Sequence, residues 1–410
     1  MDGLRTRGQP VALAAIRAML GSGLPHAVLL AGPGGVGKTT LALDIAAALL
    51  CQDASGGERP CRACRGCRMV DHGNHPDLHR LAPGGSGGLI SIGGREERGV
   101  RELVRELAYL PVEGGARVAI VESAHRMTED AQSAFLKTLE EPPARTTIIL
   151  CADEEERLLS TIRSRVARVR LGPMGPRDVE AVLAEQGVAD APTAARLARI
   201  TDGRPGHAIA LARAPQAVVI RGEIARTLLD LLGLGVTARL LGTRDLAARA
   251  AELIRALEAG AQEATTAASS TRASRGRSRS PGAAQLVANA TGTSHGPAVG
   301  DESAAEADAA VEERSVRVPA AERRRAALAL LDIWRAVARD LGLVVVGDAR
   351  AVRDADLLDD LTGPAACFDS ASLGSALRRL DVAAERLEGN VSPELVLDVL
   401  ALRWTPPRAA

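Results

Sequence analysis

The 410-residue sequence predicts an α/β domain with a mostly parallel sheet, then a small helical domain and a larger all-helical domain. Three observations support this fold class. Short apolar runs alternate with helical periodicity up to about residue 171, and only helical periodicity continues beyond it. A glycine-rich loop also joins an apolar run to an amphipathic helix, which is the strand-loop-helix context of a phosphate-binding site.

The expected strands are the apolar runs 27–31, 117–121 and 147–151, with a strand-like piece near Leu78–Leu81. Beyond them, Pro173 and Pro176 break the pattern. Helical periods then follow at 179–183, 194–200 and 207–211, and longer helical regions cover 217–259 and about 319–402.

These patterns place a nucleotide-binding domain at 1–171 and a small helical domain at 172–214. A helical C-terminal domain is built from 215–259 and 313–405. Residues 260–312 are rich in Ala, Ser, Thr, Gly and Arg, with almost no large apolar residue. Such a composition cannot bury a core, so we expect a disordered insertion within the last domain.

Composition limits the function further. The formal net charge is zero, so the chain as a whole has no electrostatic attraction to nucleic acid, and any DNA contact is expected to be shared with partners. No apolar run approaches the roughly 18 residues that span a membrane. We therefore expect a cytoplasmic protein with no membrane partner.

The phosphate-binding loop is complete. Its glycines permit backbone conformations in which successive N–H groups face a phosphate, Lys38 reaches the β/γ oxygens and Thr39 binds Mg²⁺. ATP with Mg²⁺ is therefore the expected cofactor. The residues predicted to bind it are Gly32, Pro33, Gly34, Gly35, Val36, Gly37, Lys38, Thr39, Thr40 and Glu122.

The second acidic motif is altered. The strand 117–121 is followed by Glu122-Ser123, where an efficient ATPase of this kind carries Asp-Glu. Glu122 could still bind the metal, but Ser123 is no base near neutral pH. Asp153 or Glu154 could substitute, and the sequence does not place them. The pattern favours ATP binding without efficient hydrolysis.

Four cysteines form a second motif. Cys51, Cys61, Cys64 and Cys67 follow a C-x9-C-x2-C-x2-C pattern among arginines, which favour the thiolate form. Four thiolates at these spacings predict a closed, structural Zn²⁺ site, with redox thiols as the alternative. His72, His75 and His79 follow and are interpreted as loop residues rather than ligands.

Several further segments accompany these motifs: Gly8-Gln9, Pro25-His26-Ala27, His75-Pro76-Asp77, the string LKTLEEPP at 136–143 and Ser164-Arg165. Together with the loop and the cysteines they resemble the bacterial clamp-loader branch of the AAA+ ATPases across almost the whole first domain. The resemblance implies an AAA+ domain, a helical lid and an all-α collar domain.

Within that branch, three features favour the delta prime family over the gamma/tau motor. They are Glu122-Ser123, Gly206 at the position of the motor's second sensor arginine with Arg204 two residues out of register, and a final collar-like helix after Asn390 with no long tail. The resemblance implies a DNA polymerase III subunit in a ring with gamma/tau and delta, which helps to load the sliding clamp on primer-template DNA at the replisome. Polymerase activity would then belong to the complex.

By the same resemblance, Arg165 is expected to act as an arginine finger on the nucleotide of a neighbouring subunit. Two alternatives stay open. One is a DNA-stimulated ATPase of gamma/tau type that turns over ATP at its own site. The other is an unrelated signalling ATPase, which explains neither the cysteines nor LKTLEEPP.

Overall fold

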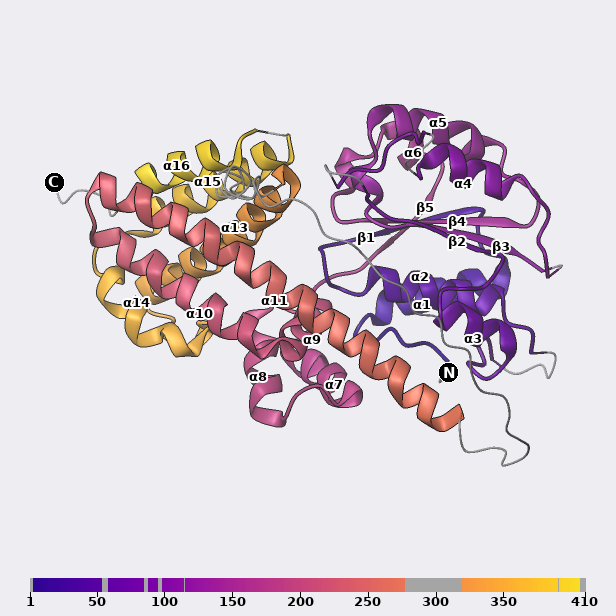
Figure 1. The fold of residues 1–410 in the computed structure, drawn as a ribbon, viewed down its shortest axis with the longest axis horizontal. Helices are drawn as coiled ribbons and strands as arrows, with labels where there is room; N and C mark the ends of the chain where they lie inside the picture. The colour runs from indigo at the N-terminus through magenta and orange to yellow at the C-terminus, as the bar shows by residue number, and fades with distance from the viewer. Residues whose placement is uncertain are drawn as a thin grey trace, which may run out of the picture.

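A computed structural model describes residues 3–53, 58–84, 88–94, 98–113, 115–276, 319–389 and 391–405. A domain built around a sheet and a body made only of helices stand side by side (Figure 1). Three short helices lie between the two, and the long helix α11 (Val236–Gly276) starts in the helical body and runs past them. None of the described helices combines the length and apolarity needed to cross a bilayer.

The described residues form a five-stranded sheet in the order β2-β3-β4-β1-β5, with every pair parallel. The strands are β1 (Ala27–Ala31), β2 (Leu78–Leu81), β3 (Arg117–Val121), β4 (Thr146–Ala152) and β5 (Ala167–Arg170). The three central strands are buried along their whole length, as expected when helices cover both faces of a parallel sheet. The edge strand β5 was not expected, because its alternating Ala-Arg-Val-Arg sequence buries only Val169 well.

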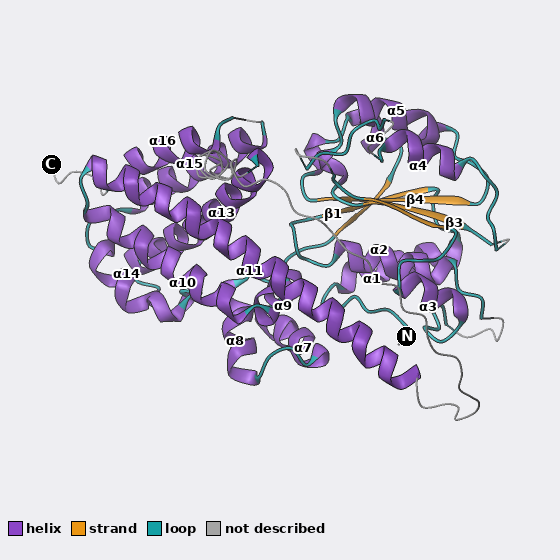
Figure 2. Ribbon diagram, in the orientation of Figure 1, coloured by secondary structure: helices purple, strands orange, loops and turns teal. Residues whose placement is uncertain are grey.

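Helices cover the two faces of the sheet (Figure 2). One layer contains α1 (Pro10–Ser22), α2 (Lys38–Leu49) and α3 (Arg65–Asp71), and the other contains α4 (Val100–Leu107), α5 (Glu129–Glu140) and α6 (Ser160–Arg163). Strand residues alternate between the layers: Val28 and Leu30 pack in the first core, while Leu29 packs in the second. Helices therefore cover both faces of the sheet, and the carboxyl ends of the strands remain available for a functional site.

The remaining helices share one core. The short helices are α7 (Pro176–Gln186), α8 (Ala191–Ile200) and α9 (Pro205–Arg213), and the others are α10 (Pro215–Asp230), α11, α13 (Ala320–Val345), α14 (Leu358–Ala365), α15 (Ser370–Glu388) and α16 (Pro393–Arg403). Buried residues of all these helices form one contiguous cluster. Near its far end, Trp334 and Trp404 meet edge to face at 5.5 Å, and the Trp404 indole donates to the Leu228 carbonyl at 2.8 Å.

The predicted fold class is confirmed: an α/β domain with a parallel sheet is followed by small helices and an all-helical body. Besides β5, one more expectation differs from the structure. Helical backbone continues to Gly276, beyond the expected start of the insertion at residue 260. This part of α11 is rich in alanine, which has the highest helix propensity and needs no core partner to form a turn. The rest of the predicted insertion, 277–312, lies outside the described residues.

Candidate nucleotide site and metal centre

The phosphate loop lies at the carboxyl end of β1 and runs directly into α2, which begins at Lys38. Gly32, Gly35 and Gly37 have φ values of 149°, 79° and 103°, which side-chain-bearing residues rarely adopt. Gly37 is the N-cap of α2 and offers no capping side chain. The free N–H groups of the first turn, which include Thr39 and the exposed Thr40, therefore form a cradle for an anion.

Lys38 already has partners inside the chain. Its side chain is only 7% exposed, and Nζ lies 2.8 Å from Oδ1 of Asp153. The same ammonium donates to the Gly32 and Pro33 carbonyls at 2.6 Å each. Asp153 comes directly after β4, the strand next to β1, so the sheet order brings this carboxylate to the loop. An internal anion thus pairs with the lysine that would bind phosphate.

His125 lies behind Asp153, and sequence reasoning gave it no role. The Asp153 backbone N–H donates to His125 Nδ1 at 3.2 Å, so that nitrogen carries no proton. Burial lowers the pKa of His125 to about 4, although the nearby Asp153 opposes the shift. His125 is therefore a neutral acceptor that fixes the backbone at Asp153.

Glu122 of the altered acidic motif also has a partner inside the chain. Glu122 Oε1 accepts from Arg80 Nε at 2.9 Å and from Nη2 at 2.5 Å, across the β2–β3 pair. Ser123 has a left-handed φ of 50°, rare for a residue other than glycine. Of the two possible substitutes, only Asp153 reaches the loop, since Glu154 pairs with Arg157 at 3.2 Å.

The start of α9 packs on the loop. The Gly206 N–H donates to the Gly35 carbonyl at 2.8 Å, and a Cβ at Gly206 would lie 3.1 Å from that oxygen. A Cβ at Gly35 would lie 2.7 Å from the His207 ring, whose pKa is lowered by burial. The predicted sensor position at Gly206 thus lies against the loop without an arginine. Arg204 is turned back, because its Nε donates to the Thr201 carbonyl at 3.1 Å.

Arg165 lies between α6 and β5, with its side chain 35% exposed. Nη2 lies 2.8 Å from Oε1 of Glu140, and Nη1 donates to the Thr161 carbonyl at 2.9 Å and to the Ser164 hydroxyl at 3.2 Å. Glu140 belongs to the LKTLEEPP string. The fold therefore joins two segments that carry the predicted resemblance, LKTLEEPP and Ser164-Arg165, on one surface.

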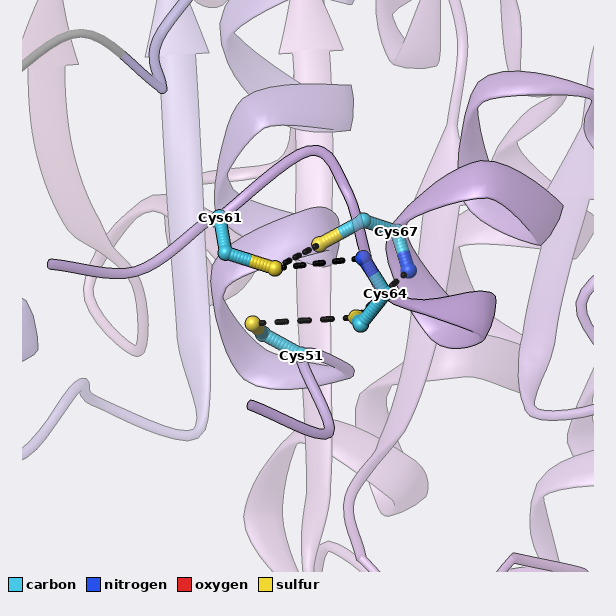
Figure 3. Close-up of side chains that lie close together, drawn as sticks. All are labelled: Cys51, Cys61, Cys64 and Cys67. Atoms are coloured by element: carbon cyan, nitrogen blue, oxygen red, sulfur yellow. Dashed lines mark hydrogen bonds between the residues drawn. The ribbon is translucent and has the colours of Figure 1, made fainter. Parts of the chain in front are cut away.

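The four cysteines converge between the end of α2 and the start of α3 (Figure 3). All four sulfur atoms lie within 4.8 Å of one another. Two of the pairs, Cys51 with Cys64 and Cys61 with Cys67, are 3.9 and 4.0 Å apart. The edge of a tetrahedron with 2.3 Å Zn–S bonds is about 3.8 Å, so this donor set fits Zn²⁺.

Backbone N–H groups orient two of these sulfur atoms. Cys64 Sγ accepts from Gln52 N and Cys67 N at 3.4 Å each, and Cys61 Sγ accepts from Cys64 N at 3.3 Å. Burial opposes ionisation of Cys64, but these donors outweigh it and lower its pKa to about 6. Burial raises the pKa of Cys67 instead. A bound Zn²⁺ would supply charge and cross-linking here, with no open position for catalysis.

The nearby histidines have other partners. His79 Nδ1 lies 2.8 Å from Glu106, and His75 is buried beside Asp77, whose N–H donates to its Nδ1 at 3.1 Å. Among the described residues, the group of possible metal ligands contains the four cysteines and no histidine.

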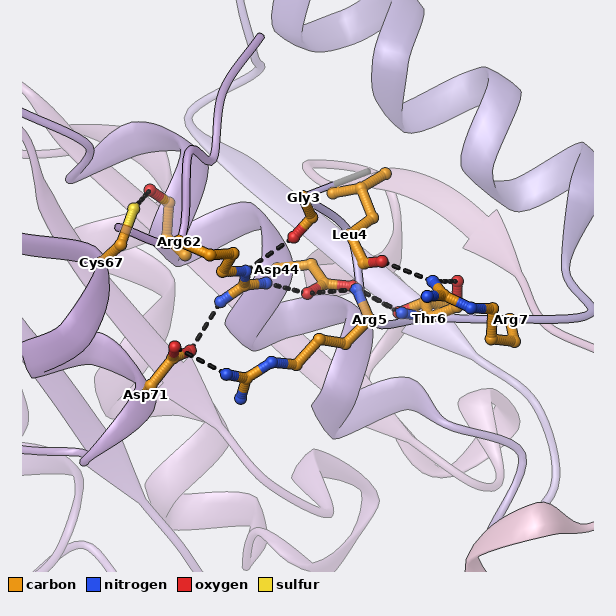
Figure 4. Close-up of polar contacts among 10 residues, drawn as sticks. Gly3, Leu4, Arg5, Thr6, Arg7, Asp44, Arg62, Cys67 and Asp71 are labelled. Carbon is orange, nitrogen blue, oxygen red and sulfur yellow. Dashed lines mark hydrogen bonds and ion pairs between the residues drawn. The ribbon is translucent and has the colours of Figure 1, made fainter. Parts of the chain in front are cut away.

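Arg62, inside the cysteine motif, connects the cluster to the rest of the domain (Figure 4). Its guanidinium contacts Asp44 of α2, lies 2.6 Å from Asp71 and donates to the Gly3 carbonyl at 2.6 Å. Asp44 is 1% exposed and also accepts from Arg5 N at 3.0 Å and from the Thr6 hydroxyl at 2.7 Å. Sequence reasoning missed this network, since nothing near Asp44 signals its partner.

The chain is similar to known proteins, and the family match lies in this first domain. Residues 8–175 match the family described as DNA polymerase III, delta subunit. A DNA polymerase III subunit delta' of Bacillus subtilis is 34% identical over 203 residues, which cover 50% of this chain and 58% of that one. The Escherichia coli subunit delta' is 38% identical over 186 residues, 45% of this chain and 54% of that one. The chain thus spans little more than half the length of these relatives.

More distant similarity reaches the gamma/tau group. A DNA polymerase III subunit tau of Salmonella typhimurium is 30% identical over 210 residues, 50% of this chain and 31% of that one. A solved structure of a gamma subunit-related protein from Thermotoga maritima aligns with 95% of this chain and 97% of its own, at 15% identity and a TM-score of 0.38.

The first domain has the phosphate loop, parallel sheet and flanking helices of a P-loop fold. Within that class, the predicted resemblance to the delta prime subunits of DNA polymerase III is confirmed by the family match and the relatives.

Proposed function

We propose that this chain is the delta prime subunit of a DNA polymerase III clamp loader, with a nucleotide site of its own that binds ATP weakly or without efficient turnover. Arg165 acts in trans on the nucleotide of a neighbouring subunit while the sliding clamp is loaded on primed DNA. The partners are gamma/tau and delta in a hetero-oligomeric ring, and primer-template DNA is contacted through the assembly in the cytoplasm. Polymerase activity belongs to the complex.

The ion pair between Lys38 of the phosphate loop and Asp153 is the observation on which the proposal for the chain's own site rests. The Lys38 ammonium is paired with Asp153, and Glu122 is paired with Arg80. Nucleotide binding has to break the first pair and leaves a carboxylate beside the γ-phosphate, where like charges repel. Hydrolysis further needs a group that activates water, and Ser123 cannot serve as one. These contacts support weak binding and slow turnover.

The exposure of Arg165 supports its role in trans. A guanidinium that is 35% exposed and held by Glu140, the Thr161 carbonyl and the Ser164 hydroxyl can rotate toward a neighbouring subunit without disturbing the core. A finger of this type stabilises charge on the transferring phosphoryl group. The resemblance to delta prime subunits supplies the assembly in which such a neighbour exists.

The cysteine cluster is proposed to hold one structural Zn²⁺. The domain bounds are also part of the proposal: 1–171 for the AAA+ domain, 172–214 for the lid, and 215–259 with 313–405 for the collar. The single core shared by α7 to α16 implies that lid and collar move together as one body.

A reconstituted loader tests the arginine finger. We expect Arg165→Ala to assemble normally and to lower the DNA-stimulated ATPase rate of the loader by about tenfold, because one subunit loses its transition-state cation. Arg168→Ala is the matched control: this arginine lies three residues on, is 43% exposed and pairs with Glu155 inside the chain. An assembled Arg165→Ala loader with an unchanged rate would refute the role.

The alternative, a gamma/tau-type ATPase, is tested on the purified chain alone. The proposal predicts no sustained turnover with or without DNA. Turnover that Lys38→Ala abolishes would establish the alternative, since Lys38 is the cation of the chain's own loop.

A further inference from the structure

A groove between α15 and α16 is lined with arginines. It has a volume of about 320 Å³, and its basic residues are Arg378, Arg379 and Arg386 from α15 and Arg403 from α16. The α15 residues that line the groove, at positions 375, 378, 379, 382, 383 and 386, follow a three- or four-residue spacing, so they lie on one face of that helix. The two helices lie side by side in the helical body (Figure 1), and the C-terminal end of α15 contacts the sheet domain through Glu388 and Arg157.

This positive charge is not neutralised within the described residues. No carboxylate lines the groove, and Arg379 makes a 2.8 Å hydrogen bond only to the Ser375 hydroxyl. Four acids of the same two helices pair elsewhere: Asp381 with Arg335 at 3.0 Å, Glu388 with Arg157 at 2.6 Å, Glu394 with Arg323 at 2.5 Å and Asp398 with Arg244 at 3.9 Å. The fifth acid, Glu385, is exposed and does not line the groove. In a chain with 51 basic and 51 acidic residues, such a cluster is a local exception.

The crowding has an electrostatic cost. Burial and then the neighbouring Arg403 and Arg378 lower the pKa of Arg379, so its charged form is less favoured there than in water. An anion placed between these guanidinium groups would remove that repulsion. Arginine also offers several donors in a planar fork, which suits carboxylates and phosphates.

The spacing requires an extended ligand. Arg378 and Arg386 are eight residues apart on α15, which corresponds to about 12 Å along the helix. One carboxylate or phosphate cannot bridge that distance. A second hollow, of about 470 Å³, continues past Arg379 and Arg403 to Ser372 and Thr405.

The floor of the groove indicates which polyanion fits. It is aliphatic, with Val382, Val396 and Val399 between the arginines, and Val382 is 43% exposed. No aromatic side chain lines this groove among the described residues. Phe368 and Trp404 line the second hollow, but Trp404 is only 3% exposed and its ring packs against Phe368 at 6.2 Å, so they offer little open face on which a base could stack. Apolar side chains can cover the valines, while carboxylates reach the arginines on both walls.

We propose that this groove docks an acidic amphipathic helix of a partner protein, with the apolar side chains of that helix on the valines and its carboxylates on Arg378, Arg386 and Arg403. The inference rests on the groove alone and does not depend on the proposed function. Complementary charge sets partner choice and association rate.

Fluorescence anisotropy on the full chain tests the proposal. The probe is a labelled synthetic helix of sixteen or so residues with Glu on one face and Leu or Val on the other, and a peptide with Lys in place of Glu is its control. We expect binding by the acidic helix alone, weakened by salt. Arg386→Glu should weaken it about tenfold or more, because it replaces attraction by repulsion at an exposed site. Arg350→Glu, the same charge reversal on an exposed arginine outside the groove, should leave it unchanged.

Three results would overturn the proposal. The first is equal binding by wild type and Arg386→Glu when circular dichroism shows both proteins folded. The second is groove-dependent binding of a labelled dT20 strand in preference to the peptide, which would make the groove a nucleic-acid site. The third concerns residues 300–313, which contain Asp301, Glu302, Glu306, Asp308, Glu312 and Glu313. Peptide binding that occurs only after their deletion would mean that the chain itself supplies the occupant.

Discussion

The cysteine cluster and the phosphate loop are both complete motifs, yet the fold treats them differently. The four thiols face one another within 4.8 Å and keep their positions through backbone N–H donors. The loop keeps its glycine geometry, but its lysine is paired with Asp153 and its rim is packed against α9. A complete motif therefore fixes the shape of a site. Its availability depends on which charged groups the rest of the fold brings to it.

The two sites are connected through one helix. Lys38 begins α2, and Asp44 further along it receives Arg62 from the cysteine module. The N-terminal segment that Arg62 and Asp44 hold continues to Arg7, which lies 2.8 Å from Glu185 of α7, and to Gln9, which donates to the Gly172 carbonyl at 2.7 Å. Substitutions in the cysteine module should therefore also affect the stability of the rest of the domain.

Removing one thiolate is the largest expected effect. We predict that Cys64→Ser lowers the zinc content from about one equivalent per chain to near zero and the melting temperature by about 10 °C or more. Serine keeps the N-cap of α3, which Cys64 Sγ now supplies, so the loss reports the metal rather than the helix. Metal analysis and thermal unfolding measure both. Cys367→Ser, at an exposed free cysteine, is the control, and wild-type protein purified without zinc would contradict the prediction.

Cutting the connection between the sites should have a smaller effect. Arg62→Ala leaves the buried Asp44 carboxylate without its cation, although the backbone N–H groups of Arg5 and Thr6 still donate to it. We expect a loss of about 2–3 kcal/mol in the free energy of unfolding, measured by urea denaturation, with zinc content retained. Arg68→Ala, at an exposed arginine of the same module, should change stability by less than about 0.5 kcal/mol. Equal losses in the free energy of unfolding for the two substitutions would show that the Arg62 contacts do not stabilise the domain more than an exposed arginine does.

Releasing Lys38 is the smallest and most specific change. Asp153→Asn keeps the shape of the side chain and removes the charge that pairs with Lys38. We expect Mg-ATP to bind about five- to tenfold more tightly in a calorimetric titration, because nucleotide no longer competes with or is repelled by this carboxylate. Glu154→Gln, next to it but paired with Arg157, is the control and should not change affinity. Weaker binding by Asp153→Asn would instead make Asp153 a ligand of the metal.

The sequence alone predicted much of this architecture. Periodicity located four of the five described strands, and short-range spacing identified the loop residues 32–39 and all four cysteines. These features depend on residues close together in the chain, so pattern and local chemistry suffice. The sequence did not predict the edge strand β5, because arginines interrupt its apolar pattern. It did not predict the extension of α11 either, because a composition poor in large apolar residues suggests disorder even where alanine favours a helix.

The tertiary structure decided what the motifs can do. The pairs Lys38–Asp153 and Arg62–Asp44, the contact of Gly206 with Gly35, and the arginine groove between α15 and α16 all join residues from different elements. Coulomb and hydrogen-bond energies depend on distances of a few ångströms, and strand order and helix packing set those distances. The sequence therefore determined which chemical groups this protein carries, and the fold determined which of them are already satisfied and which remain free to bind.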